Sequence, residues 1–359
     1  MMPQTLTVSV KLNPSKEQIK ILKSMSQLYI QTMNELVSEM VANKKTTKKT
    51  TKYLDVALPS AVKNQLIRDA KSVFQKVKKS NYQTIPVLKK PVCYWNNQNY
   101  SIKSNQLELP LMIEGAVKKT PIPMYFDLLS ESQKNYLTHK LGTVRIVQKN
   151  RKWFAQFSTT IVTTPKMGTS VMGIDLGLKV PAVAVTDTNK VQFFGNGRQN
   201  KYMKRKYKSQ RRRLGKLKKL SVIKKLNNKE QRYMKDQDHK ISRSIVNFAQ
   251  RNKISILRLE CLENIRRTAK TSRKNNGNLH TWSFYRLSQM IEYKAQLAGI
   301  QVEYVNPAYT SQTCPNCGER NHAKDRTYEC ACGFKSHRDL VGAMNIRYAT
   351  VIDGNSQSA

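Results

Sequence analysis

The chain has 359 residues, enough for two or three domains. It carries 64 lysines and arginines against 23 aspartates and glutamates, which gives a formal net charge of +41. This excess excludes an ordinary enzyme of small neutral substrates. It is typical of a protein that binds a polyanion, because each phosphate contact releases bound counterions. We therefore expect nucleic acid as the partner.

Targeting signals are absent from the sequence pattern. No apolar run approaches the roughly 20 residues of a membrane span. The first ten residues contain no basic region followed by a long apolar core, so we expect no signal peptide, no membrane partner and a cytoplasmic location. In such a compartment clustered cysteines indicate metal rather than disulfides. Cys93 and Cys261 stand alone, and we expect each to be a small buried hydrophobe.

The first half of the chain predicts strands around a helical insertion. Residues 4–12 alternate in polarity and predict a strand, and helices follow at about 15–40 and 59–78. Between them, residues 43–52 are a cationic low-complexity loop. Short alternating runs separated by Asn and Gly turns then extend from about 92 to 165. This pattern predicts a small antiparallel barrel that the first strand joins.

The second half alternates strands and helices after a linker at 162–170. The predicted elements, in order, are strands at 171–175, 180–186 and 191–195, a basic helical region at 199–252, a strand at 254–260, a loop at 266–279, a helix at 282–298, a strand at 301–305 and a last helix from Asp339. Strand 254–260 is apolar on both faces and is therefore expected in the centre of a sheet.

Three acids stand at the ends of these elements. Asp175 ends the run Val-Met-Gly-Ile-Asp, Glu260 ends strand 254–260, and Asp339 opens the last helix. Three strands, a helix, a strand and further helices are typical of an RNase H-like fold, in which the first and fourth strands lie side by side. We expect the carboxylates to meet there and bind Mg²⁺, the metal of phosphodiester hydrolysis.

Each acid also has a plainer interpretation. Asp175 fits a turn residue, Glu260 a solvated strand end and Asp339 a helix N-cap. Glu263 lies three residues after Glu260 and competes with it as a ligand. The spacing of the acids leaves these alternatives open. A cysteine cluster beside Asp339 and a one-sided basic stretch favour the metal site.

The remaining four cysteines form two pairs, separated by twelve residues: Cys314 with Cys317, and Cys330 with Cys332. Four thiolates match a closed, tetrahedral, structural Zn²⁺ site. The second pair is C-x-C rather than the commoner C-x-x-C. His322 and His337 are alternative ligands that a four-thiolate set does not need.

Residues 201–220 contain eleven lysines or arginines and no acid. A solvated helix face usually mixes both signs of charge, so this stretch predicts a helix that lies along a phosphate backbone. The predicted nucleic-acid contacts are Lys204, Arg205, Lys208, Arg211, Arg212 and Arg213, together with Arg338 beside the last acid.

Four segments carry a family resemblance: residues 173–177 (Gly-Ile-Asp-Leu-Gly), Leu259-Glu260, residues 309–318 (Tyr-Thr-Ser-Gln-Thr-Cys-Pro-Asn-Cys-Gly) and His337-Arg338-Asp339. In this order they resemble TnpB, the OrfB-type transposon-encoded proteins related to type V CRISPR effector nucleases. The resemblance covers about 171–348, and before residue 165 it is one of layout only. Cys261 and the shortened second cysteine pair depart from the family pattern, but neither removes an acid.

The resemblance implies a multidomain α+β protein in which a wedge-like β-barrel with a helical insertion precedes an RNase H-like (RuvC) α/β nuclease domain. The expected domains are the barrel at 1–12 and 80–165, a helical recognition insertion at 13–79, the RuvC-like nuclease domain at 166–312 and 335–350, a zinc-binding insertion at 313–334 and a disordered tail at 351–359.

The implied function is RNA-guided, Mg-dependent DNA cleavage. A guide RNA from the transposon end would pair with double-stranded target DNA next to a short motif read by the protein. Asp175, Glu260 and Asp339 would be the catalytic metal ligands. Two alternatives are a nuclease-silent RNA-guided regulator, which the intact acids count against, and a DNA transposase that joins ends through the same acids. A zinc-finger transcription factor accounts for the cysteines and the charge, but not for Asp175 and Glu260.

Overall fold

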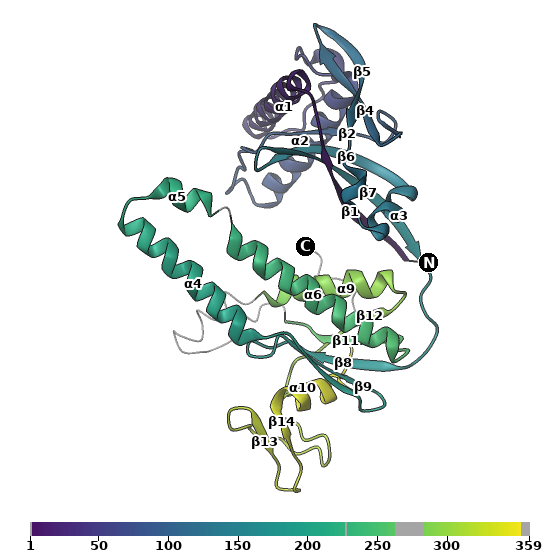
Figure 1. Cartoon of the computed structure of the whole chain (residues 1–359), viewed down its shortest axis with the longest axis vertical. Coiled ribbons are helices and arrows are strands. Elements are labelled where there is room, and N and C mark those ends of the chain that lie inside the picture. Colours follow the sequence, from purple (N-terminus) through teal and green to yellow (C-terminus); the bar gives the residue numbers. More distant parts are fainter. Residues whose placement is uncertain (1, 227, 263–282, 353–359) are drawn as a thin grey trace. The chain divides into compact units, whose positions relative to one another are not determined.

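The computed structural model describes residues 2–226, 228–262 and 283–352 (Figure 1). The chain separates into two compact units, one of Thr5–Ile161 and one of Val162–Ala359 with Met1–Gln4. Both units combine helices with sheets, so the fold is multidomain α/β. None of the described helices is both long and apolar enough to cross a membrane.

The strands of the N-terminal unit form two sheets. The four-stranded sheet has the order β1-β7-β6-β2 and comprises β1 (Met2–Leu12), β2 (Val92–Trp95), β6 (Lys140–Lys149) and β7 (Lys152–Thr163). The three-stranded sheet has the order β3-β4-β5 and comprises β3 (Ser101–Lys103), β4 (Gln106–Ile113) and β5 (Ala116–Pro123). The alternating runs of the sequence predicted all of these strands except β5.

The predicted barrel does not close among the described residues. An isolated bridge between Leu12 and Met124 links the end of β1 to the residue after β5. Two prolines in β5, Pro121 and Pro123, have no backbone N–H to donate, which favours an edge position for this strand. At the other edges β2 and β3 have only four and three residues. The strands therefore form two linked sheets instead of a barrel.

Helices α1 (Lys16–Ala42), α2 (Ser60–Lys79) and α3 (Glu131–Thr138) complete this unit, with 3-10 turns at Thr51–Tyr53 and Phe126–Leu128. A capping box of Ser15 and Gln18 starts α1. Ser130 and Gln133 form the same motif before α3, which the sequence analysis missed. The buried stripe of α1 and the inner faces of both sheets share one hydrophobic core.

The C-terminal unit is built on a five-stranded sheet of order β10-β9-β8-β11-β12. Its strands are β8 (Val171–Asp175), β9 (Ala182–Thr186), β10 (Val191–Phe194), β11 (Ile256–Glu260) and β12 (Gln301–Val305). Strands β8, β9 and β10 are antiparallel neighbours, whereas β11 runs parallel to both β8 and β12. The predicted central position of residues 254–260 and the neighbourhood of the first and fourth strands are confirmed.

Helices cover both faces of this sheet (Figure 1). The basic region is divided into α4 (Gly197–Lys216), α5 (Leu220–Lys225) and α6 (Lys229–Arg251). Residues of α6 and α9 (Phe284–Leu297) pack on one face, and α10 (Arg338–Ile346) packs on the other through Ala343. Gly173 permits this close approach, because a Cβ there would overlap the carbonyl oxygen of Ala343. The cysteine segment, residues 314–337, contains the short strands β13 (Thr327–Glu329) and β14 (Lys335–His337).

Candidate functional site

Asp175 is the last residue of β8 and lies directly against α10. Part of the residue remains accessible to solvent, but protein atoms surround it closely on most sides. A Cβ added to Gly342 of α10 would lie 3.3 Å from the carboxylate carbon of Asp175. A larger residue at 342 would therefore require the carboxylate to shift. The helix that carries Asp339 therefore packs against the acid of the first strand.

Burial raises the pKa of Asp175 well above its usual value. The charges of Glu260 and Asp339 raise it further, because like charges oppose ionisation. Arg338 and Arg326 act in the opposite direction. Three acids distant in sequence therefore share one electrostatic environment, and a cation bound there would relieve their repulsion.

Glu260 ends β11, one residue beyond the register pair Leu259–Ile174 that joins β11 to β8. Its carboxylate accepts a short hydrogen bond from the hydroxyl of Thr310. Burial raises the pKa of Glu260, and the Thr310 hydrogen bond opposes that shift by favouring the ionised form. Thr310 thus fixes one oxygen of Glu260 and helps to keep the group charged.

Asp339 is the second residue of α10 and is buried. Its Oδ1 lies 2.6 Å from Nη1 of Arg326, which donates a charged hydrogen bond. Its Oδ2 is also buried and has no hydrogen-bond partner among the described residues. An unpartnered buried carboxylate oxygen costs free energy unless a ligand or cation satisfies it. The residues present therefore fit a divalent cation.

The carboxylates are gathered less tightly than the thiols. The four cysteine sulfurs lie within 4.8 Å of one another, whereas the described residues contain no group of three carboxylates that meets the same limit. Glu263, the competing acid of the sequence analysis, lies outside the described residues. Asp175, Glu260 and Asp339 are brought into one neighbourhood, as the sequence predicted.

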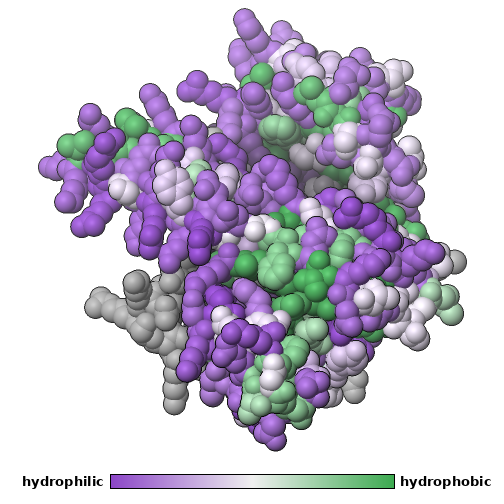
Figure 2. Space-filling model, turned by 60° about the horizontal axis from the view of Figure 1, so that its bottom comes forward, coloured by the Kyte–Doolittle hydropathy of each residue, from purple (hydrophilic) through white to green (hydrophobic). Residues whose placement is uncertain are grey.

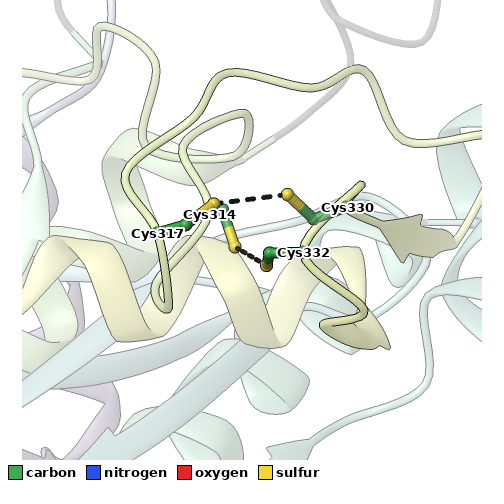
Figure 3. Close-up of side chains that lie close together, drawn as sticks. All are labelled: Cys314, Cys317, Cys330 and Cys332. Carbon is green, nitrogen blue, oxygen red and sulfur yellow. Dashed lines mark hydrogen bonds between the residues drawn. The ribbon is translucent and has the colours of Figure 1, made fainter.

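The four cysteines form the compact cluster that their spacing predicted (Figure 3). The sulfurs of Cys314 and Cys332 are 3.7 Å apart, and those of Cys317 and Cys330 are 3.5 Å apart. Thiolate sulfurs at such distances fit one closed tetrahedral zinc site.

Two asparagine side chains donate hydrogen bonds to the sulfurs of the second cysteine pair. Nδ2 of Asn316 lies 3.6 Å from the sulfur of Cys332, and Nδ2 of Asn321 lies 3.2 Å from the sulfur of Cys330. The Asn316 hydrogen bond, aided by a backbone donor, lowers the pKa of Cys332 to about 6, which favours the thiolate that a metal binds.

The alternative histidine ligands lie outside this cluster. His337 caps α10 by accepting the N–H of Asp339 at 3.2 Å, and its ring packs edge-on against Phe193. His322 is exposed and does not belong to the gathered set of ligands. Cys93 is buried in the N-terminal unit, as predicted, and Cys261 is only partly buried.

The cysteine segment and α10 form one structural piece. Cys314 and Tyr328 share a small core with Val341 of α10. Asn345 of α10 donates to the carbonyl oxygens of Thr310 and Thr313, at 2.7 Å each. The segment that would bind zinc thus supports the helix that carries Asp339 and the turn that presents Thr310 to Glu260.

Sequence reasoning missed Arg326, Thr310 and Asn345. Thr310 stands inside the motif that carries the family resemblance, so its position was a usable signal. Arg326 had no comparable signal, because a lone arginine in a basic chain does not predict which acid it contacts.

Helix α4 presents the predicted basic residues. Only Gly197 and Leu214 of this helix are buried, so most of its cations face solvent, and the surface of this region is predominantly hydrophilic (Figure 2). Arg211 forms an ion pair with Glu230 of α6 at 2.6 Å. Burial lowers the pKa of Lys204, which is half-buried against the same helix. Exposed positions on α4 are Arg205, Lys208, Arg212 and Arg213.

Arg338 is exposed at the start of α10, beside the acids rather than on α4. Its Nη2 lies 3.5 Å from the hydroxyl of Ser311, and its charge lowers the pKa of Asp175. The fold and the site together define an α/β protein with two candidate metal centres joined through α10.

Comparison with known proteins identifies the family. Residues 146–266 match the OrfB_IS605 family, described as a probable transposase, and residues 284–346 match the Cas12f1-like TNB domain. A TnpB-like protein of Methanocaldococcus jannaschii is 32% identical over 197 residues, which are 52% of this chain and 70% of that protein. The chain belongs to the TnpB-like family.

Two further likenesses extend this result. The CRISPR-associated endodeoxyribonuclease Cas12f1 of Sulfoacidibacillus thermotolerans is 27% identical over 234 residues, 58% of this chain and 53% of that relative. The chain thus spans about half the length of this relative. The solved structure of a Cas12f1–sgRNA–target DNA complex aligns with a TM-score of 0.67 at 15% identity, covering 96% of this chain and 98% of the other. That likeness shows a shared fold.

Proposed function

We propose that this protein is an RNA-guided, Mg-dependent DNA endonuclease of the TnpB type. The convergence of Asp175, Glu260 and Asp339 at the adjoining ends of β8, β11 and α10 carries the proposal. The family, a DNA-cutting relative and a fold shared with a guide-RNA–target-DNA complex support it. The net charge of +41 supports nucleic acid as both guide and target.

The three acids would hold Mg²⁺ through their carboxylate oxygens. A bound Mg²⁺ lowers the pKa of a water molecule and stabilises the leaving oxygen of the phosphodiester. Arg326 neutralises one oxygen of Asp339 and leaves Oδ2 for the metal. Thr310 partly offsets the burial that raises the pKa of Glu260. These residues would keep the site ready for metal while it lacks one.

The other parts of the chain have proposed roles that follow from the family. The sheets at 1–12 and 80–165 would form a wedge, and the helices at 13–79 would form a recognition insertion. Residues 166–312 and 335–350 would be the RuvC-like nuclease domain, with a structural Zn²⁺ held by the insertion at 313–334. Of the tail predicted at 351–359, Val351 pairs with Val305 of β12, and residues 353–359 lie outside the described residues. The exposed cations of α4 would grip guide or target phosphates, and the protein would act at the nucleoid of its host.

Copurification followed by cleavage tests this function. RNA that remains bound to the purified protein is sequenced, and a plasmid library matched to that guide is incubated with Mg²⁺ or with EDTA. We expect cleavage only of matched targets that carry a common flanking motif, and only with Mg²⁺. Guided binding without cleavage would identify a nuclease-silent regulator, and joined DNA products would identify a transposase.

A further inference from the structure

A cavity of about 440 Å³ lies next to Asp339, one of the three acids. Its walls come from the turn after β8, the first turns of α4, and residues of α6, α9 and the cysteine segment. Arg326 lines the cavity and also contacts Asp339 at 2.6 Å. Gly177, another wall residue, passes close to Oδ2 of the same acid, because a Cβ there would lie 3.9 Å from it. Two wall residues of the cavity therefore lie next to Asp339, although the acid itself does not line the cavity.

The polar part of the cavity is cationic. Its lining contains five basic residues, Lys179, Arg198, Lys201, Lys204 and Arg326, against one acid, Asp238. Asp238 is already neutralised by Arg286, whose Nη2 and Nε lie 2.6 and 2.7 Å from its Oδ2. Lys179 and Arg326 are likewise paired, with Asp325 and Asp339. Arg198, Lys201 and Lys204 therefore give the wall its positive charge, which favours an anion.

The first turn of α4 reinforces this preference. The helix has 20 residues, and the partial positive charge of its N-terminal end favours an anion nearby, while Gln199 N–H is donated to the N-cap Asn196. Gly197 lets this end press against the turn after β8, because a Cβ there would overlap the carbonyl oxygen of Leu178. Gly197 N–H donates to the carbonyl of Lys179 at 3.0 Å, which fixes the helix end on the cavity wall.

The remaining wall is apolar, which a site for phosphate alone does not require. Leu178, Pro181, Met234 and Leu287 form it, and the last two are buried. Pockets of a few hundred Å³ that combine apolar walls with a few placed charges typically bind organic ligands. A nucleotide has both parts, since its base is a flat, largely apolar surface and its phosphate is an anion.

We infer that this cavity binds one nucleotide of the DNA strand that is cut, with its base against Met234 and Leu178 and its phosphate at Lys201 and the start of α4. The inference rests on the proposed function, because it assigns the cavity to the substrate of the neighbouring acids. Such a nucleotide would hold the strand so that the next phosphate reaches Asp175, Glu260 and Asp339.

Methyl NMR on the full chain tests the cavity directly. The protein has 13 methionines, and Met234 lines this cavity. Protein labelled with ¹³C-methyl methionine is titrated with thymidine 5′-monophosphate in EDTA, and the Met234 signal is assigned by its loss in Met234→Leu. We expect the Met234 signal to shift saturably, whereas the signal of Met33 in the N-terminal unit stays fixed.

Matched charge reversals give the control. Lys201→Glu changes the cavity, whereas Lys190→Glu makes the same charge change at an exposed position between β9 and β10, outside the residues that line the cavity. We expect the first to weaken the titration at least about tenfold, equivalent to ~1.4 kcal/mol, and the second to leave it within about twofold. Leu178→Trp, at a position that is 44% exposed, should fill the cavity and abolish the shift without loss of folding.

Several outcomes would overturn the inference. A fixed Met234 signal, an equal effect of Lys201→Glu and Lys190→Glu, or equal saturation by inorganic phosphate would each exclude a nucleotide in this cavity. The titration needs neither metal nor guide RNA. A wild-type protein that fails to cut a matched target but still shifts Met234 would therefore refute the proposed function and not the cavity.

Discussion

The C-terminal unit contains two candidate metal centres of opposite construction. The thiol cluster gathers four residues from within 314–332, and two of its cysteines, Cys317 and Cys332, are exposed. The carboxylate cluster gathers residues from 175 to 339, on two strands and a helix, in a buried environment. The thiols are packed closely, whereas the acids repel one another. One centre is a local turn motif, and the other exists only when the whole sheet has formed.

This difference assigns different tasks to the two metals. A closed set of four thiolates leaves no open position for substrate, so zinc would act through structure. Buried acids with an unpartnered oxygen can accept a metal that also contacts substrate and water. The two centres depend on each other, since Arg326 of the cysteine segment contacts Asp339 and Val341 of α10 joins the core of that segment.

The largest expected effect separates the two centres. Asp175→Ala should lower guided cleavage by more than about 100-fold, because it removes a proposed metal ligand. Loss of a residue that only contacts a ligand typically costs up to about 100-fold, and loss of the ligand itself should cost more. Guide RNA binding and zinc content should stay at wild-type values. Cleavage of a matched target and metal analysis by mass spectrometry measure both quantities.

Asp187→Ala is the matched control for this variant, since Asp187 is an exposed acid just after β9. It should cut at the wild-type rate. Mg²⁺ should raise the melting temperature of the wild type and of Asp187→Ala but not that of Asp175→Ala. Wild-type cutting by Asp175→Ala would remove the acids from the mechanism.

The second-largest effect is expected from a change in the zinc centre, which should lose the metal that Asp175→Ala keeps. Cys317→Ser should lose the bound zinc and loosen α10, because the segment packs on Val341 and holds Asp339 through Arg326. We expect cleavage to fall about 10–100-fold, with faster amide exchange in α10. Cys93→Ala, in the N-terminal unit, should keep one zinc per chain. Unchanged exchange in α10 after zinc loss would show that the two centres are independent.

The sequence predicted the thiol centre more completely than the carboxylate centre. Four cysteines within one short segment predict a zinc site without knowledge of the fold, and the structure confirms their clustering. For the acids, the sequence predicted that the strands ending at Asp175 and Glu260 would be neighbours, because the order of the predicted elements is typical of an RNase H-like fold. It could not predict that Asp339 would pair with Arg326, since that contact depends on how the cysteine segment folds back on α10.

In the N-terminal unit, too, the sequence predicted individual strands but not how they pair. Period-2 alternation predicted strands such as β2 and β7, but not whether they would close into a barrel. Closure depends on edge pairing, and the prolines of β5 weaken that pairing. Strand β5 itself lacks clear alternation because most of its side chains are exposed on both faces.

A smaller change probes how the carboxylate centre is held. Thr310→Val removes the hydroxyl that donates to Glu260 but keeps the shape of the side chain. That hydrogen bond lowers the pKa of Glu260 against the effect of burial, so its loss should raise this pKa. Since the charged form binds metal, the acidic limb of the pH–rate profile should move to higher pH, and about 10-fold more Mg²⁺ should be needed.

Thr313→Val is the control for this change, because its hydroxyl donates to the carbonyl of Tyr309 at 3.1 Å in the same turn and does not contact an acid. It should keep the wild-type profile and Mg²⁺ requirement. An identical shift in both variants would mean that the turn as a whole, and not the hydroxyl of Thr310, sets the properties of Glu260.

The smallest expected effect concerns the cations that serve neither centre. Arg212→Ala on α4 removes an exposed charge, whereas Arg211→Ala removes one that is already paired with Glu230 at 2.6 Å. If α4 lies along a duplex backbone, loss of one phosphate contact should reduce the slope of log K against log salt by about 0.9. We expect this decrease for Arg212→Ala and a smaller one for Arg211→Ala, measured as guide or target affinity over a salt series. Equal slopes for both variants and the wild type would place the nucleic-acid contacts elsewhere, because a charge that binds phosphate must release counterions when it does so.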